Sequence, residues 1–241
     1  MIEIAEAKHA ATVILLRPAE PRGMEVLLTR RPDEMAFLGG MYCFPGGTMQ
    51  REDFSSAILR RCHGLSPIAA RKIIGAHFSP QEALGLWVAA IRELFEETGV
   101  ILAITADGSI AATDRDRNRS LADKHTTLIA RRLSFSALLE AENLYCDTTR
   151  LAYFSQWRTP SQFKVRFDTR FFLGSVPAEH SPLAASPEVA HSLWLTPDHA
   201  LQRFSQGTLP MIFPTFASLR TLADFDSLES LFAEFAQLNS R

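Results

Sequence analysis

Three glutamates lie close together in the stretch RELFEETGV, residues 92–100. Glu93, Glu96 and Glu97 are three and four positions apart, and on an α-helix side chains at these spacings project from one face and repel one another. A divalent cation removes that repulsion, because Mg²⁺ prefers oxygen ligands from a few carboxylates, water and phosphate groups. The spacing therefore indicates a site for one or more cations facing a diphosphate. The alternative is a solvated acidic helix end, in which Arg92 simply pairs with Glu96.

A long helix must carry these carboxylates. Ser79 is suited to the N-cap, Pro80 to the first helical position and Glu82 to closing a capping box. Gly99 supplies a stop signal. The segment therefore predicts a helix of about 19 residues, roughly 28 Å long. Apolar residues at three- and four-residue steps mark its buried side, namely Leu84, Trp87, Val88, Ile91 and Leu94.

The rest of the chain predicts an α+β protein with a mixed sheet flanked by helices. Strands are expected, from β-branched and aromatic content, at 11–18, 24–32, 151–160, 166–177 and 189–195. Helices are expected at 53–63, 66–78, 134–143, 196–204 and 215–237. The glycine-rich residues 37–47 predict an irregular loop. The polar residues 106–125 predict a solvated loop, with a segment that borders a site as the alternative.

Composition limits the function classes. The 241 residues suit one domain, 1–241, and the net charge of −2 gives no basic footprint for nucleic acid or membrane surfaces. No apolar run approaches the ~18 residues of a membrane span, and the first ten residues lack a secretion-signal pattern. The three cysteines, Cys43, Cys62 and Cys146, predict unpaired thiols, so we expect a cytoplasmic protein.

Two separated stretches complete a known signature. Phe44-Pro45-Gly46-Gly47 is followed by five residues and then Asp53, and the later stretch runs from Arg92 to Val100. Together they resemble the signature of the Nudix hydrolases: Gly, five residues, Glu, a spacer, then Arg-Glu-apolar-any-Glu-Glu-any-Gly-apolar. Asp53 stands where that family has Glu, with Glu52 beside it as an alternative. The spacer, residues 54–91, is far longer than the usual seven.

The resemblance implies a fold and an activity. It implies a Nudix-type mixed sheet sandwiched between helices, with extra C-terminal helices at about 197–241. The long spacer implies a helical insertion at about 54–79, which is tolerable because loop-closure entropy grows slowly with length. The implied activity is that of a pyrophosphatase, a hydrolase acting on phosphorus-containing acid anhydrides.

The substrate follows from a subgroup. Residues 157–160 and 166–173 resemble the long-spacer Nudix proteins that include the peroxisomal coenzyme A diphosphatase of animals. A coenzyme A motif ahead of Phe44 is matched at Leu27, Leu28, Thr29, Arg31 and Gly40. Ala36 replaces the second arginine of that motif, and Pro32 its small residue. We therefore expect coenzyme A or acyl-CoA. A dinucleotide, a nucleotide sugar, or a non-catalytic nucleotide-binding module remain alternatives.

The resemblance also assigns metal and catalytic roles. Glu93, Glu96 and Glu97, with Asp53, would ligate Mg²⁺ or Mn²⁺, and one glutamate would serve as the base. Arg92 would orient a glutamate through a charge-assisted bond.

Other residues would handle the substrate, a small-molecule nucleotide. Gly46 and Gly47 would allow close backbone approach, and Arg31 would contact phosphate. Glu188, far downstream, is an alternative base or an exposed loop carboxylate. Further cations that could contact phosphates, or could be ion-paired instead, are Arg30, Lys164, Arg166 and Arg170. Homodimers are common in the family, so the resemblance allows one here.

Overall fold

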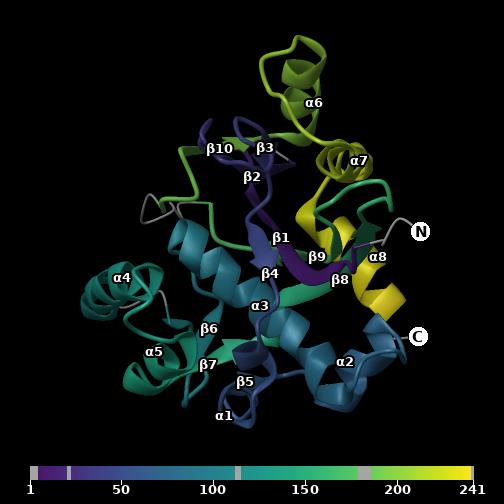
Figure 1. Cartoon of the computed structure of the whole chain (residues 1–241). Coiled ribbons are helices and arrows are strands. Elements are labelled where there is room, and N and C mark those ends of the chain that lie inside the picture. Colours follow the sequence, from purple (N-terminus) through teal and green to yellow (C-terminus); the bar gives the residue numbers. More distant parts are fainter. Residues whose placement is uncertain (1–4, 21–22, 112–114, 179–185, 240–241) are drawn as a thin grey trace.

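The computed structural model describes residues 5–20, 23–111, 115–178 and 186–239. A seven-stranded mixed sheet crosses the molecule (Figure 1) in the order β10-β2-β1-β9-β8, with β3 paired to β2 and β4 to β1. Its strands are β1 (Lys8–Pro18), β2 (Met24–Arg30), β3 (Tyr42–Cys43), β4 (Gly46–Thr48), β8 (Leu151–Arg158), β9 (Phe167–Ser175) and β10 (His191–Leu195). A three-stranded sheet has the order β5 (Cys62–His63), β7 (Leu144–Asp147), β6 (Ala103–Thr105).

Helices cover both faces of the larger sheet. In chain order the helical elements are η1 (Arg51–Phe54), α1 (Ser56–Leu59), α2 (Pro67–Ile74), α3 (Pro80–Thr98), α4 (Arg115–Ile129), α5 (Phe135–Ala141), η3 (Thr148–Arg150), α6 (Pro197–Ser205), α7 (Phe213–Leu222) and α8 (Leu228–Asn239). None of the described helices is long and apolar enough to span a membrane.

Strand β1 shows how the layers form. It is antiparallel to β2 and parallel to β9. Val13 and Leu15 lie in the core that contains α3, whereas Ile14 and Leu16 lie in the core formed with α6, α7 and α8. Alternate side chains of a strand point to opposite faces, so both faces of β1 are buried under helices. The predicted mixed sheet sandwiched between helices is confirmed, as is the hairpin β1–β2, although residues 21–22 of its turn lie outside the described residues.

The central helix α3 begins and ends where its caps predict. The Ser79 hydroxyl accepts from the backbone N–H of Glu82, and the Glu82 carboxylate accepts from that of Ser79 at 2.9 Å. Gly99 ends the helix in the left-handed region, with φ of 70°. The helix is buried on nearly every side, so the charged residues near its C-terminal end are held among packed neighbours.

The polar segment 106–125 is not a solvated loop, and this prediction was wrong. Helix α4 begins at Arg115 and runs beyond the segment to Ile129, although residues 112–114 lie outside the described part. Leu121, His125 and Leu128 are buried at helical spacing, and the His125 Nε2 is 3.0 Å from the backbone oxygen of Glu96. This narrow buried stripe docks α4 on α3, and it was masked by the polar residues around it.

The insertion at 54–79 contains helices, as predicted, and in addition a short strand. It contains the four-residue α1, then strand β5, and then α2. Strand β5 pairs in parallel with β7, where Cys62 lies opposite Cys146. The pairing partner lies far along the chain, so local sequence gave no sign of it. All three cysteines are unpaired, as predicted.

The glycine-rich segment 37–47 is also more regular than predicted. Its second half forms β3, and β4 begins at Gly46. In β4, Gly46 and Gly47 lie opposite Thr12 and Ala11 of β1. The segment therefore continues the sheet up to the C-terminal half of α3 instead of forming only an irregular loop.

Contact between η1 and α3 depends on Gly85. A Cβ atom at this position would lie 2.8 Å from the Cβ of Phe54. Alanine is favoured over glycine within helices by up to about 1 kcal/mol, but overpacking a rigid neighbour costs about 1–3 kcal/mol. We therefore expect Gly85→Ala to lower the Tm by a few degrees in a thermal melt. A raised Tm would show that η1 can shift without cost.

Candidate active site

Arg92 is the hub of the charged end of α3. Its Nε and Nη2 donate to the two carboxylate oxygens of Asp53 at 2.8 and 2.9 Å, and Nη2 also donates to the backbone oxygen of Thr48 at 3.0 Å. Its Nη1 donates to Glu93 at 2.8 Å and to Glu96 at 3.2 Å. These contacts occupy all five N–H groups of the guanidinium. Arg92 is therefore a positioning residue with no donor left for a ligand.

Burial disfavours the charged form of Arg92, and the acidic neighbours of Arg92 favour that form. Its side chain is only 4% exposed, and burial alone would lower its pKa, but the hydrogen bonds that it donates to Asp53 and the charge of Glu93 raise the pKa above the ordinary value. The arginine therefore stays charged and holds two glutamates in place.

Asp53 lies beneath this arginine and not among the cavity-facing carboxylates. It is fully buried, and its second oxygen also accepts from the backbone N–H of Gln50 at 2.7 Å. The alternative residue, Glu52, does line the cavity described below, and accepts a hydrogen bond from Ser136 of α5. Asp53 is thus bound to Arg92 and is not among the residues that line the cavity.

Gly47 lies directly against the Glu93 carboxylate. A Cβ atom at Gly47 would be 2.6 Å from the carboxyl carbon of Glu93. Gly46 instead faces β1, where a Cβ would be 2.5 Å from the backbone oxygen of Ala11. Both glycines therefore permit the close approach of β4 to its neighbours, and Gly47 permits it at a predicted ligand.

We expect Gly47→Ala to displace Glu93 and to lower activity by at least about tenfold, because small misplacements of reacting groups are costly. Steady-state hydrolysis rates measure this. Gly207→Ala is a control for strain alone, since nothing lies within 4 Å of its added Cβ but its φ of 72° is unfavourable for alanine; it should lower the Tm without lowering the rate. Equal activity of Gly47→Ala and the wild type would show that the position of Glu93 is not critical.

The three glutamates of α3 share one electrostatic environment. Burial raises the pKa of Glu97 well above its ordinary value, and the carboxylates of Glu93 and Glu188 raise it further. Arg31 and the backbone N–H of Gly46 offset only part of this. Burial also raises the pKa of Glu93 to about 7, and that of Glu96 above its usual range. Burial first, and mutual repulsion second, therefore disfavour the charged forms of these carboxylates.

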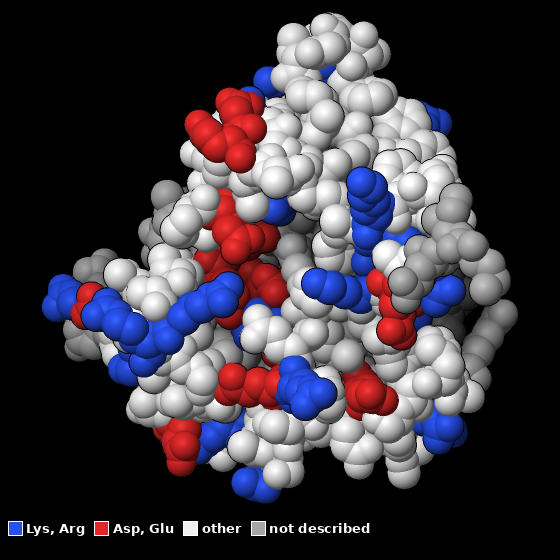
Figure 2. Space-filling model, viewed as in Figure 1, with Lys and Arg blue, Asp and Glu red and all other residues white. Residues whose placement is uncertain are grey.

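These side chains open into one cavity of about 610 Å³. Glu93, Glu96 and Glu97 line it together with Glu188, which stands far away in sequence. Figure 2 shows acidic side chains gathered in the central hollow of this face, with basic side chains of the α4–α5 side extending toward it from the left. The volume lies in the range of pockets that hold nucleotide-sized ligands, about 300–1,000 Å³.

The arginines predicted to contact phosphate lie in different surroundings. Arg31 lies near Glu97, and its Nε donates to the backbone oxygen of Phe37 at 3.2 Å. Arg170 is fully buried and pairs with Asp168 at 2.5 Å. Arg30 pairs with Asp33 at 2.6 Å, and Arg166 donates to the backbone oxygens of Thr159 and Ala5. Of these, only Arg31 is close to the glutamates.

The donor set suits a divalent cation, since carboxylate oxygens are the ligands that Mg²⁺ and Mn²⁺ prefer and their mutual repulsion would be relieved. Within the described ranges, however, no three His, Cys, Asp or Glu side chains already converge as a coordinating group. Glu93 and Glu96 both accept from Arg92. Binding therefore requires a side-chain rotation, for which the partly exposed Glu96 is best placed.

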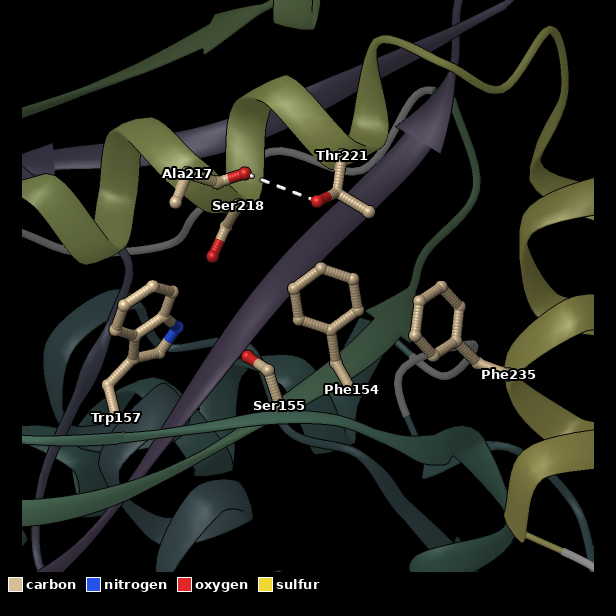
Figure 3. Close-up of a pocket in the computed structure, with 7 residues that line it drawn as sticks. All are labelled: Phe154, Ser155, Trp157, Ala217, Ser218, Thr221 and Phe235. Atoms are coloured by element: carbon tan, nitrogen blue, oxygen red, sulfur yellow. Dashed lines mark hydrogen bonds between the residues drawn. The ribbon is translucent and has the colours of Figure 1, made fainter.

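A second cavity, of about 170 Å³, lies between β8 and the helices α7 and α8 (Figure 3). Its lining residues are Phe154, Ser155, Trp157, Ala217, Ser218, Thr221 and Phe235. No charged side chain lines it, so it is unsuited to phosphate or metal chemistry. The acidic cavity is the candidate active site.

Comparison with known proteins agrees with this geometry. The family profile described as the NUDT19 Nudix domain matches residues 70–222, which is more than half of the chain. The chain belongs to this Nudix family. The matched region includes the whole of α3 and reaches the end of α7, so it contains Glu93, Glu97 and Glu188.

The chain is also similar to individual Nudix proteins. Acyl-coenzyme A diphosphatase NUDT19 of Gallus gallus is 28% identical over 89% of the chain, and that of Homo sapiens is 26% identical over 89%. The chain spans 65% and 64% of the lengths of those two proteins. A crystal structure of a Nudix hydrolase from Alicyclobacillus acidocaldarius is 28% identical, with a TM-score of 0.76, covering 96% of this chain and 97% of that one. The resemblance seen in the sequence is confirmed.

The cavity also contains two residues that the sequence did not single out. Arg131 and Arg132, between α4 and α5, line it together with the glutamates of α3. They follow a segment expected to be a solvated loop, where an arginine pair carries no signal. Only the packing of α4 on α3 brings them to the site.

Proposed function

We propose that this Nudix domain hydrolyses the diphosphate linkage of a nucleoside diphosphate derivative, with coenzyme A or acyl-CoA as the substrate. The observation that carries the proposal is the convergence of Glu93, Glu96, Glu97 and Glu188 on one nucleotide-sized cavity. The names of the avian and human relatives support the choice of substrate, as does Arg31, which keeps its motif position and lies near Glu97.

We propose Mg²⁺ or Mn²⁺ as the cofactor, since Nudix hydrolases in general depend on divalent metals. Glu93, Glu96 and Glu97 would hold it. When bound, the cation supplies charge neutralisation at the phosphate oxygens and lowers the pKa of water. Asp53, which the signature would add to the ligands, acts instead by fixing Arg92.

The remaining work falls to the chain's own residues. Phosphoryl transfer depends mainly on positioning and on charge stabilisation. Arg92 fixes Glu93 and Glu96, while Gly47 allows Glu93 to reach its place. Glu188, an exposed residue that lines the same cavity, would accept a proton from the attacking water. Water adds to one phosphorus and the bridging oxygen leaves, so coenzyme A would give 3′,5′-ADP and a phosphopantetheine.

Ala36 supports a second candidate class of substrate. This residue is exposed and replaces an arginine of the coenzyme A motif, so one cation expected at the site is missing. A dinucleotide or a nucleotide sugar would then be the better substrate. A non-catalytic nucleotide-binding module is the third reading, and the intact glutamate set argues against it.

A substrate panel tests the proposal. The purified chain is incubated with coenzyme A, acetyl-CoA, NAD and ADP-ribose across millimolar Mg²⁺ and Mn²⁺, and products are identified by chromatography and mass spectrometry. We expect metal-dependent release of 3′,5′-ADP from coenzyme A or acetyl-CoA at the highest kcat/KM. Preferred cleavage of NAD or ADP-ribose would show that coenzyme A is not the substrate. Binding of these nucleotides without hydrolysis of any of them would overturn the proposed hydrolase activity.

The cytoplasmic location and a homodimer stay predictions from sequence and resemblance. Fractionation of the native cell tests the first, and light scattering of the purified chain tests the second.

A further inference from the structure

Two arginines of the cavity lining, Arg131 and Arg132, have side chains that are available to a ligand. Arg131 and Arg132 are exposed at the rim of the cavity, and neither guanidinium has a hydrogen-bond or ion-pair partner among the residues that the structure describes. Arg92, the other arginine lining the cavity, has committed all its donors to Asp53, Glu93, Glu96 and Thr48. Among the described residues that line the cavity, Arg131 and Arg132 are therefore the positively charged groups available to an anionic group that enters on the α4–α5 side.

The backbone at Arg131 is unfavourable for an arginine. Helix α4 ends in a turn in which the backbone N–H of Arg131 donates to Leu128 at 2.8 Å and that of Arg132 to Thr127 at 3.0 Å. This pattern places Arg131 in the left-handed region, with φ of 56°. Glycine is the usual residue there, because a Cβ atom is strained in that conformation. An arginine kept at such a position points to a use for its side chain.

The turn is held firmly against the site. His125 of α4 packs edge-on against Phe95 of α3 and contacts the backbone oxygen of Glu96. On the other side, Ser136 of α5 donates to Glu52 of η1. The turn that carries Arg131 and Arg132 thus follows a helix packed on α3, the helix of the glutamates.

We propose that Arg131 and Arg132 bind a phosphate monoester of the substrate that is distinct from the diphosphate being cleaved, such as the 3′-phosphate of a coenzyme A-type nucleotide. This inference rests on the proposed function. The scissile diphosphate belongs beside the carboxylates and their cation. A second phosphate on the same nucleotide lies away from that cation, and the neighbouring guanidinium groups at the rim offer it charge-assisted hydrogen bonds.

Mononucleotide binding tests the proposal without turnover. Calorimetric titration of the full chain with 3′,5′-ADP and with 5′-AMP gives the ratio of their dissociation constants. We expect the wild type to bind 3′,5′-ADP about tenfold to a hundredfold more tightly. Arg131→Gly and Arg132→Gln should each reduce that ratio by about tenfold, with 5′-AMP binding unchanged.

Two controls separate function from folding. Arg119→Gln removes an exposed arginine of α4 that does not line the cavity, and should leave the ratio unchanged. Arg131→Gly should also raise the Tm by about 2 °C, since glycine relieves the left-handed strain, so a weakened ratio there cannot be due to unfolding.

The outcomes are distinct. A wild-type ratio near one, no binding of 3′,5′-ADP, or the same ratio in all variants overturns the proposal. A chain that hydrolyses coenzyme A but fails to discriminate the two nucleotides overturns this inference alone. A chain that discriminates them but cleaves nothing overturns only the proposed activity.

Discussion

Replacing Glu97 by glutamine is expected to lower kcat/KM about 1,000-fold, which corresponds to about 4 kcal/mol of transition-state stabilisation. Glutamine keeps the shape of the side chain but removes the negative charge that a cation needs. Glu97 is the most deeply buried of the three helix glutamates, and Glu93 and Glu188 act on it electrostatically. Steady-state rates with saturating Mg²⁺ measure the loss.

The same substitution should stabilise the metal-free protein. Because burial raises the pKa of Glu97 and of Glu93 above 4.5, the folded chain binds more protons than the unfolded chain above that pH. Stability then falls as pH rises from about 4.5 through 7. We expect Glu97→Gln to raise the Tm by about 3 °C or more at pH 8 in chelator, and to have little effect near pH 4.5.

Glu234→Gln is the matched control, because it makes the same chemical change on the exposed surface of α8. It should alter neither rate nor Tm. A Glu97→Gln variant with wild-type rates would remove Glu97 from the site, whatever its effect on stability.

Asp53→Asn is expected to destabilise the fold strongly. Breaking a buried ion pair by removing one partner costs about 3–5 kcal/mol, because the other charge is left partly uncompensated. In a domain of this size that corresponds to a fall in Tm of roughly 10 °C. Thermal melts in chelator measure it without any metal contribution. Activity should fall as well, since Arg92 would no longer be fixed.

This experiment separates the two roles that Asp53 has been given. Asp123→Asn, on the exposed face of α4, is the control and should leave the Tm unchanged. If Asp53→Asn kept the wild-type Tm in chelator but weakened Mn²⁺ binding, Asp53 would be a metal ligand and not the anchor of Arg92.

Local chemistry made α3 predictable. Ser79, Pro80, Glu82 and Gly99 fix its two ends through caps that depend only on neighbouring residues. The apolar spacing fixes its buried side. The sandwich was also predictable, since β1 and β2 carry strong strand signals and a turn between them.

Features that depend on distant contacts were not predictable. Strand β5 exists only because β7 lies beside it, and α4 is held by three buried residues among many polar ones. The roles of Asp53 and Arg131 depend on the same kind of contact. Signature position alone made Asp53 a ligand, whereas packing of η1 on α3 places it under Arg92, and no local pattern marked Arg131.

Binding of Mn²⁺ to the purified chain, followed by electron paramagnetic resonance as the signal of the free ion disappears, tests the central claim most directly. We expect the wild type to bind Mn²⁺ saturably. The affinity of Glu97→Gln should be weaker by about tenfold or more, and that of Glu234→Gln should equal the wild-type affinity. Identical titrations of the wild type and Glu97→Gln would contradict the claim that the buried glutamates of α3 hold the cation.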